Sequence, residues 1–256
     1  MSPRVERKGR PGRLVVLPAV VLTVMAFLAA SCSGGPSEEA ANDLSERCMK
    51  EDLGVPVQET PYDPGSGEGV DGFVLGEGSS GVVFSNQIDT DLCDWLPLAS
   101  KLAGEDTRTL IYDYSYKPDA AKEVKAAAAE LSKLGVEEVV LVGASKGGVG
   151  SLAAASSIRE PEVTGVVSLS AVGEFEGLDS REAARKLRMP LLLMAARDDG
   201  DTAEVARDVT EISPSEDEHV EVFGGYDHGI ALLDGEDGPQ ARELLMKFVR
   251  GNLPRG

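Results

Sequence analysis

One short stretch in the middle of the chain, residues 137–148, constrains the fold more than any other. The apolar run 139–143 is typical of a strand buried on both faces, and the Ala- and Ser-rich residues 147–158 are typical of a helix packed behind that strand. Between them lies a Gly-x-Ser-x-Gly turn, which strains the backbone at its apex and therefore requires small neighbours. The apex residue is Ser145. A helix N-terminus favours developing negative charge, so this position suits a nucleophile.

Strand and helix signals alternate through the chain from about Val70 onward. This alternation predicts an α/β fold with a mostly parallel central sheet and helices on both faces. The expected strands are residues 72–76 at a sheet edge, then 81–85, 109–112, 139–143, 163–169, 190–195 and 219–223. The expected helices are residues 91–102, 119–134, 147–158 and 238–249.

With a buried strand before it and a helix after it, the Ser145 turn resembles the nucleophile elbow of the α/β-hydrolase family, in particular its lidless dienelactone-hydrolase-like and esterase-like members. The resemblance covers residues 70–253 and implies that family's fold. In larger members a lid domain is inserted between the strands that here end near Leu169 and begin at Pro190, and about 20 residues are too few for a substantial lid. The alternative interpretation is a turn that needs small residues for packing alone.

A serine nucleophile needs a base, and histidine has a pKa suited to that task. The chain has two histidines. His228 lies in a loop between the last expected strand and the final helix, where the resemblance places the catalytic base, whereas His219 opens a strand and is expected to be structural or exposed. The resemblance also implies an acid after the strand 190–195. Counting from Ala196, which replaces the family's Gly, this acid is Asp199, with Asp198 as the second choice. The alternative is that Asp198, Asp199 and Asp201 form only a turn cluster or a weak cation site.

The resemblance further implies an oxyanion hole made of two backbone N–H groups. One belongs to Lys146, directly after the nucleophile. The other is expected at Gln87, because Asn86-Gln87 stands where relatives commonly carry His-Gly. After Tyr112, the segment 113–118 keeps only the Asp of the motif that many relatives carry, and this difference bears on the substrate.

The first 31 residues have the three-part plan of a secretory signal: a basic segment, an apolar run over 14–30 and small residues before Cys32. The position of Cys32 resembles the lipobox of bacterial lipoproteins, although Ala29 replaces the usual Leu. This resemblance implies that Cys32 carries lipid and anchors an extracytoplasmic protein to the membrane. A single uncleaved membrane span over the apolar run is the alternative.

Residues 32–69 are expected to form a flexible tether and N-terminal extension, since the Gly-, Pro-, Ser- and Glu-rich segment 33–44 offers little apolar surface to bury. Once Cys32 is assigned to lipid, Cys48 and Cys93 remain. Outside the cytoplasm an even pair favours a disulfide, which would attach the extension to the domain of residues 70–253. Two unrelated buried thiols are the alternative.

The formal net charge of −19 becomes −23 once residues 1–31 are removed, which argues against binding to nucleic acid. The sequence therefore predicts an extracytoplasmic serine hydrolase that acts on a small-molecule or polymer-bound ester without a metal or organic cofactor. A hydrolase-fold binding protein without turnover is one alternative, motivated by Asn86-Gln87 and the altered segment 113–118. An acyltransferase or peptidase with the same triad is another.

Overall fold

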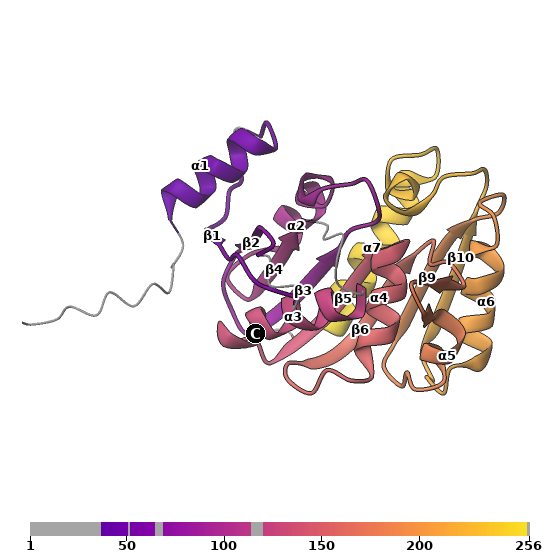
Figure 1. Cartoon of the computed structure of the whole chain (residues 1–256). Helices are drawn as coiled ribbons and strands as arrows, with labels where there is room; N and C mark the ends of the chain where they lie inside the picture. The colour runs from indigo at the N-terminus through magenta and orange to yellow at the C-terminus, as the bar shows by residue number, and fades with distance from the viewer. Residues whose placement is uncertain (1–36, 51, 65–68, 114–119, 255–256) are drawn as a thin grey trace, which may run out of the picture. The chain divides into compact units, whose positions relative to one another are not determined.

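The computed structural model describes residues 37–50, 52–64, 69–113 and 120–254 (Figure 1). The predicted signal segment, the lipid-attachment residue Cys32 and most of the altered segment 113–118 lie outside these residues. Within them, no helix combines the length and the apolar character that a membrane crossing requires.

An eight-stranded sheet forms the centre of the fold, in the order β1-β2-β4-β3-β5-β6-β9-β10. The six strands from β4 to β10 in this order run parallel, β2 is antiparallel to β4, and β1 is antiparallel to β2. The carboxyl ends of the parallel strands therefore share one edge, where α/β sheets place their ligands. The strands are β1 Val57–Glu59, β2 Gly72–Leu75, β3 Ser80–Ser85, β4 Thr107–Tyr112, β5 Glu138–Ala144, β6 Glu162–Leu169, β9 Leu191–Ala196 and β10 Glu218–Phe223.

Helices cover both faces of the sheet, as predicted. Strand β5 shows why: Val140 and Val142 face one buried core, while Val139 and Leu141 face the other. The first core is closed by α1 Glu38–Arg47, α2 Leu96–Leu102 and α7 Gly238–Asn252, and the second by α3 Ala120–Lys133, α4 Lys146–Ala155, α5 Ser180–Ala184 and α6 Thr202–Ile212. Figure 1 shows α4 in front of the sheet and α7 behind it.

The segment between β6 and β9 is short, in agreement with the prediction that no substantial lid is inserted there. It contains only the two-stranded ribbon of β7 Glu174–Phe175 and β8 Leu178–Asp179, followed by the five-residue helix α5. The site edge of the sheet is therefore not covered by an inserted domain from this segment.

The N-terminal extension corrects two expectations. Residues 38–47, expected to be a tether, form helix α1, because Ser37 caps its N-terminus by accepting a hydrogen bond from Ala40 N–H and because Ala40 and Leu44 are buried. Strand β1 pairs with the outer side of β2, so the strand predicted at the sheet edge is an interior one. Helix α1 and strand β1 belong to the same compact unit as the rest of the sheet. This unit therefore begins well before Val70.

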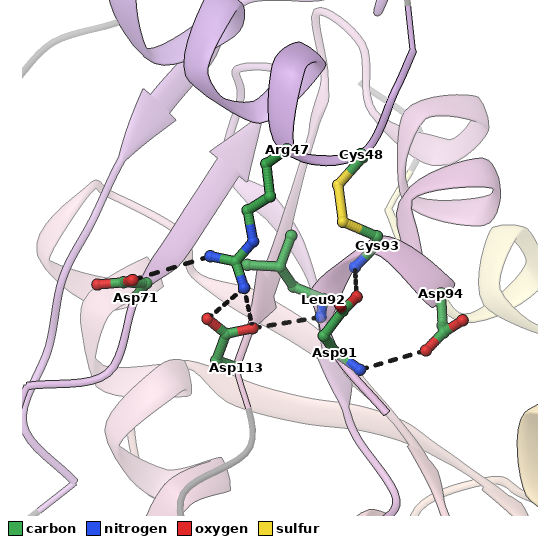
Figure 2. The surroundings of a disulfide bond; sticks show 8 residues. All are labelled: Arg47, Cys48, Asp71, Asp91, Leu92, Cys93, Asp94 and Asp113. Carbon is green, nitrogen blue, oxygen red and sulfur yellow. Dashed lines mark hydrogen bonds and ion pairs between the residues drawn. A yellow bond between two sulfur atoms is a disulfide. The ribbon is translucent and has the colours of Figure 1, made fainter. Parts of the chain in front are cut away.

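The helix predicted over 91–102 is divided into a 3₁₀ turn, η1 Leu92–Asp94, and helix α2. Asp91 caps η1, and a proline in the first turn of α2 suits a helix start. The disulfide predicted between Cys48 and Cys93 is present and joins the end of α1 to η1 (Figure 2).

Opening this disulfide is expected to destabilise the domain strongly. Its cysteines are 45 residues apart, and in the chain-entropy model a cross-link over such a loop contributes about 4 kcal/mol. We expect Cys48→Ala/Cys93→Ala to lower the free energy of unfolding by about that amount. Urea denaturation can be followed by the fluorescence of the lone tryptophan, Trp95, which is buried.

The matched control is Lys50→Met, which removes a single hydrogen bond between the extension and Ser100. This control should change the free energy of unfolding by less than about 1.5 kcal/mol. A double cysteine variant as stable as the parent protein would contradict the prediction.

Candidate active site

Ser145 occupies a strained turn between β5 and α4. Its φ of 48° and ψ of −112° lie in a region that non-glycine residues rarely adopt. Two backbone hydrogen bonds hold the turn: Ser145 N–H donates to the carbonyl of Leu169 at 2.8 Å, and the carbonyl of Ser145 accepts from Val149 N–H at 3.0 Å. Since such strain persists only where the surrounding structure enforces it, the turn is a candidate functional feature.

The glycines on either side of Ser145 are required by close packing. A Cβ atom on Gly143 would overlap the backbone of Gly147, and one on Gly147 would overlap the carbonyl of Ser85 at the end of β3. The first turn of α4 therefore lies directly against β3. The sequence indicated that this turn needs small residues, and the reason is that backbone atoms lie directly against both glycines.

His228 and Asp199 form a hydrogen-bonded pair at the same sheet edge. The distance between His228 Nδ1 and Asp199 Oδ2 is 2.7 Å. Asp199 follows β9 and His228 follows β10, and these neighbouring parallel strands end side by side. The side chain of His228 is 37% exposed and that of Asp199 is 16% exposed, so the acid is the more enclosed partner.

Contacts around the pair distinguish the two candidate acids. Asp199 Oδ2 accepts a second hydrogen bond from Thr202 Oγ1 at 3.0 Å, and the same hydroxyl lies 2.8 Å from the Asp199 carbonyl. Asp198 contributes its backbone instead, donating its N–H to the carbonyl of Gly225 in the histidine loop at 3.0 Å. The structure thus pairs Asp199 with His228. Sequence reasoning missed Thr202, although a hydroxyl three residues after an acid, at a helix start, is a usable signal.

His219 lies away from this pair, as expected. It is exposed at the start of β10, where Glu218 is in register with Leu191 at the start of β9, so it stands at the opposite edge of the sheet. Its Nε2 atom is 3.4 Å from Glu221 Oε2.

The loop after β3 is bonded to two other parts of the site. Asn86 is buried and donates its side-chain amide to the carbonyl of Tyr112 at 2.6 Å. Gln87 accepts a hydrogen bond at Oε1 from Ile230 N–H at 2.9 Å, two residues beyond His228. Gly229 has a φ of +60°, and a Cβ atom there would overlap Gln87 Oε1. The Gln87 side chain thus joins the predicted oxyanion loop to the histidine loop, a contact that sequence reasoning missed.

The side chain of Lys146 has a structural partner that the sequence did not indicate. Its Nζ atom is 2.8 Å from Glu123 Oε1 on α3, and the side chains are only 1% and 5% exposed. The residue whose backbone N–H is predicted to serve the oxyanion hole is thus fixed to the neighbouring helix by a buried ion pair.

A buried tyrosine makes a further polar contact at the end of β3. Tyr112 donates its hydroxyl to Ser85 Oγ at 2.7 Å and packs edge-on against Tyr62, with ring centroids 5.6 Å apart. Burial, and secondarily the charge of Glu123, raises the pKa of Tyr112 above its ordinary value. The phenol therefore remains protonated and serves as a donor to the end of β3.

Acidic residues are frequent near the site, but they are not arranged as metal ligands. Within the described ranges, no group of three or more His, Cys, Asp or Glu side chains converges on one point. Of the acidic turn after β9, Asp199 contacts His228 and Asp201 stands at the N-cap of α6.

Neither family models nor curated protein sequences match this sequence. Solved structures do resemble it. An esterase from Pyrococcus furiosus has a TM-score of 0.64 at 11% identity, covering 79% of this chain and 93% of its own. A dienelactone hydrolase from Anabaena variabilis has a TM-score of 0.63 at 16% identity, covering 78% and 99%. A monoacylglycerol lipase from Paleococcus ferrophilus has a TM-score of 0.60 at 14% identity, covering 72% and 99%. The chain has the α/β-hydrolase fold.

The buried ion pair of Lys146 and Glu123 generates a stability prediction. Lys146→Met removes the cation that lies 2.8 Å from the buried Glu123 carboxylate, so we expect the free energy of unfolding to fall by about 3–5 kcal/mol. The double variant Lys146→Met/Glu123→Leu should recover most of that loss, because it removes both charges. Urea denaturation measures both effects.

The matched control is Lys133→Met, which opens the exposed Lys133–Glu130 pair on α3 and should change stability by less than about 1 kcal/mol. If Lys146→Met costs no more than this control, the buried pair does not hold α4 to α3.

The bond between Gln87 and Ile230 can be tested at a single amide. Gln87→Met removes the acceptor and leaves Ile230 N–H unpaired, with an expected loss of about 1–3 kcal/mol of stability. Gln87→Glu retains an acceptor oxygen and is the matched control. Hydrogen exchange of the Ile230 amide, followed by NMR, should become faster in Gln87→Met and stay near the parent rate in Gln87→Glu. Equal exchange rates in all three proteins would count against the bond.

Proposed function

We propose that this protein is an extracytoplasmic, membrane-tethered serine hydrolase that cleaves an ester or related acyl bond with Ser145, His228 and Asp199. The observation that carries the proposal is the 2.7 Å bond between His228 and Asp199, at the sheet edge where the strained Ser145 turn also lies. A histidine oriented by a carboxylate, with a serine in such a turn at the same sheet edge, provides the three groups that an activated serine needs for acyl transfer.

In the proposed reaction, His228 keeps its Nδ1 proton and donates a hydrogen bond from Nδ1–H to Asp199, which leaves Nε2 free to accept the proton of the Ser145 hydroxyl. The serine oxygen then attacks the acyl carbon, and Asp199 stabilises the imidazolium that forms. The backbone N–H groups of Lys146 and Gln87 are the proposed donors to the oxyanion, and the N-terminus of α4 adds favourable dipole charge. His228 protonates the leaving group, and a water molecule later releases the acyl group from the enzyme.

Ester chemistry is supported by the structural relatives. The solved structures that share this fold include an esterase and a monoacylglycerol lipase. The short segment between β6 and β9 leaves the site edge without an inserted lid, which suits a bulky or polymer-bound ester as well as a small one.

The proposed location outside the cytoplasm is supported by the Cys48–Cys93 disulfide, because structural disulfides persist in oxidising compartments. Attachment through lipid on Cys32 remains a proposal from the sequence, with a single membrane span over 14–30 as the alternative.

The triad can be tested with a fluorophosphonate probe, which labels an activated serine covalently. We expect labelling of the full chain, no labelling of Ser145→Ala and a loss of several orders of magnitude in His228→Ala. Asp199→Asn should slow labelling by about 10³–10⁴-fold, because the imidazole loses the partner that fixes its tautomer.

Matched controls are His219→Ala and Asp198→Asn, which replace the same residue types outside the proposed triad and should label at close to the parent rate. A folded parent protein that does not react with the probe would contradict the hydrolase proposal and favour a binding protein. Labelling combined with transfer to an added alcohol or amine in preference to water would favour an acyltransferase.

A further inference from the structure

The end of helix α1 is attached to the loop region of the site by a covalent bond and an ion pair (Figure 2). The disulfide joins Cys48 to Cys93 in η1. The neighbouring residue, Arg47, contacts both carboxylate oxygens of Asp113 through Nη2 at 2.6 Å. Asp113 follows β4 at the site edge of the sheet, so both attachments lie on the side of the molecule that holds the candidate active site.

These attachments converge on the segment 91–94, the 3₁₀ turn η1 with its cap. Asp113 Oδ1 lies 3.5 Å from Leu92 N–H, which donates to it, so one carboxylate connects Arg47 with η1. Within the turn, Asp91 accepts from Cys93 N–H at 2.8 Å and Asp94 accepts from Asp91 N–H at 3.2 Å. The turn is thus held both from outside, by α1, and from within.

The same turn continues directly into the predicted oxyanion loop. Thr90, the residue before the cap, donates its hydroxyl to the carbonyl of Gln87 at 3.0 Å. The other side of the loop is held by the bond from Ile230 N–H to the Gln87 side chain. A continuous series of bonds therefore runs from α1 through residues 90–94 to the carbonyl of Gln87, the residue whose own N–H is the proposed oxyanion donor.

Arg47 is the cation among several carboxylates. Asp71 lies 3.8 Å from its guanidinium, and the charge of Asp91 in the turn also attracts it. Without Arg47, the carboxylates would repel one another across this junction and favour its opening, and without the disulfide the ion pair would have to hold the junction without a covalent link. The N-terminal extension thus supplies the charge that keeps residues 90–94 against the sheet edge.

We propose that the end of α1 positions the oxyanion loop, and that closure of the Cys48–Cys93 disulfide completes the active site. This inference rests on the proposed function. Arg47, Cys48 and Cys93 are positioning residues, since they act through Thr90 and Gln87. Two cysteine thiols give two electrons and two protons to the disulfide of a thiol–disulfide oxidoreductase, which becomes a dithiol as the protein disulfide forms.

The disulfide is placed where a redox partner can reach it. Both cysteines are only partly buried, and they line an open hollow of about 560 Å³ together with Met49 and Asp89. The protein would therefore have low activity before export and gain full activity once it is oxidised outside the cytoplasm.

The test compares oxidised and reduced full-length protein in detergent, with p-nitrophenyl acetate as the probe substrate. Dithiothreitol supplies two thiols, becomes a cyclic disulfide and leaves Cys48 and Cys93 as thiols. At a temperature where circular dichroism shows the reduced protein folded, we expect kcat to fall about tenfold or more while KM changes less than about twofold. Removal of an oxyanion donor lowers kcat by about 10²–10³-fold, and we expect a smaller loss here because the donor is displaced and not removed.

Variants separate positioning from stability. Cys48→Ala/Cys93→Ala should show the low kcat with or without dithiothreitol. Arg47→Met keeps the disulfide and should also lower kcat, with partial recovery in Arg47→Lys, which retains the charge but not the two-oxygen contact. Lys50→Met removes a contact of the same extension with α2 and should behave as the parent protein does.

Failure of the inference and failure of the proposed function give different results. An active parent protein with the same kcat after reduction and in Arg47→Met would overturn the inference and leave the hydrolase intact. A parent protein inactive when oxidised would contradict the proposed function. In that event, hydrogen exchange of residues 86–94 decides about positioning: faster exchange after reduction supports it, and unchanged exchange overturns it.

Discussion

The contact between the first turn of α4 and the end of β3 is the constraint on which the rest of the site depends. Gly147 lies so close to the carbonyl of Ser85 that no side chain fits between them. This contact forces the abrupt turn at Ser145 and places the start of a helix beside the loop that carries Gln87. The proposed nucleophile and the proposed oxyanion donors thus come together through backbone packing, which depends on very few side-chain identities.

Polar contacts then fix what packing alone would leave free to move. The ion pair of Lys146 with Glu123 holds the start of α4 to α3, and the bond from Ile230 to Gln87 holds the histidine loop to the β3 loop. Buried ion pairs contribute little net stability compared with apolar residues, but the loss of one partner is costly, so an intact pair keeps its two elements together. These two polar contacts, together with the backbone contact of α4 against β3, therefore fix the position of the site.

The sequence predicted most of the sheet because most of its strands are runs of apolar residues. It predicted the grouping of Ser145, Asp199 and His228 because these residues follow parallel strands that end at one edge. It did not predict α1, which buries only Ala40 and Leu44, and it also missed α6, although that helix buries five residues. It also could not predict contacts between distant segments, such as Gln87 with Ile230, which are 143 residues apart. Such contacts depend on loop paths, and a period of apolar residues carries no information about them.

The weak burial of α1 explains why its end needs covalent and ionic attachment. A ten-residue helix with two buried side chains gains little from the hydrophobic effect, and isolated helices of this length are marginal in water. A disulfide and a charged hydrogen bond hold such an element where apolar packing cannot. Because such a disulfide persists in an oxidising compartment, the extension proposed to tether the protein to a membrane is also the one through which, as we propose, the geometry of the candidate site depends on where the protein is.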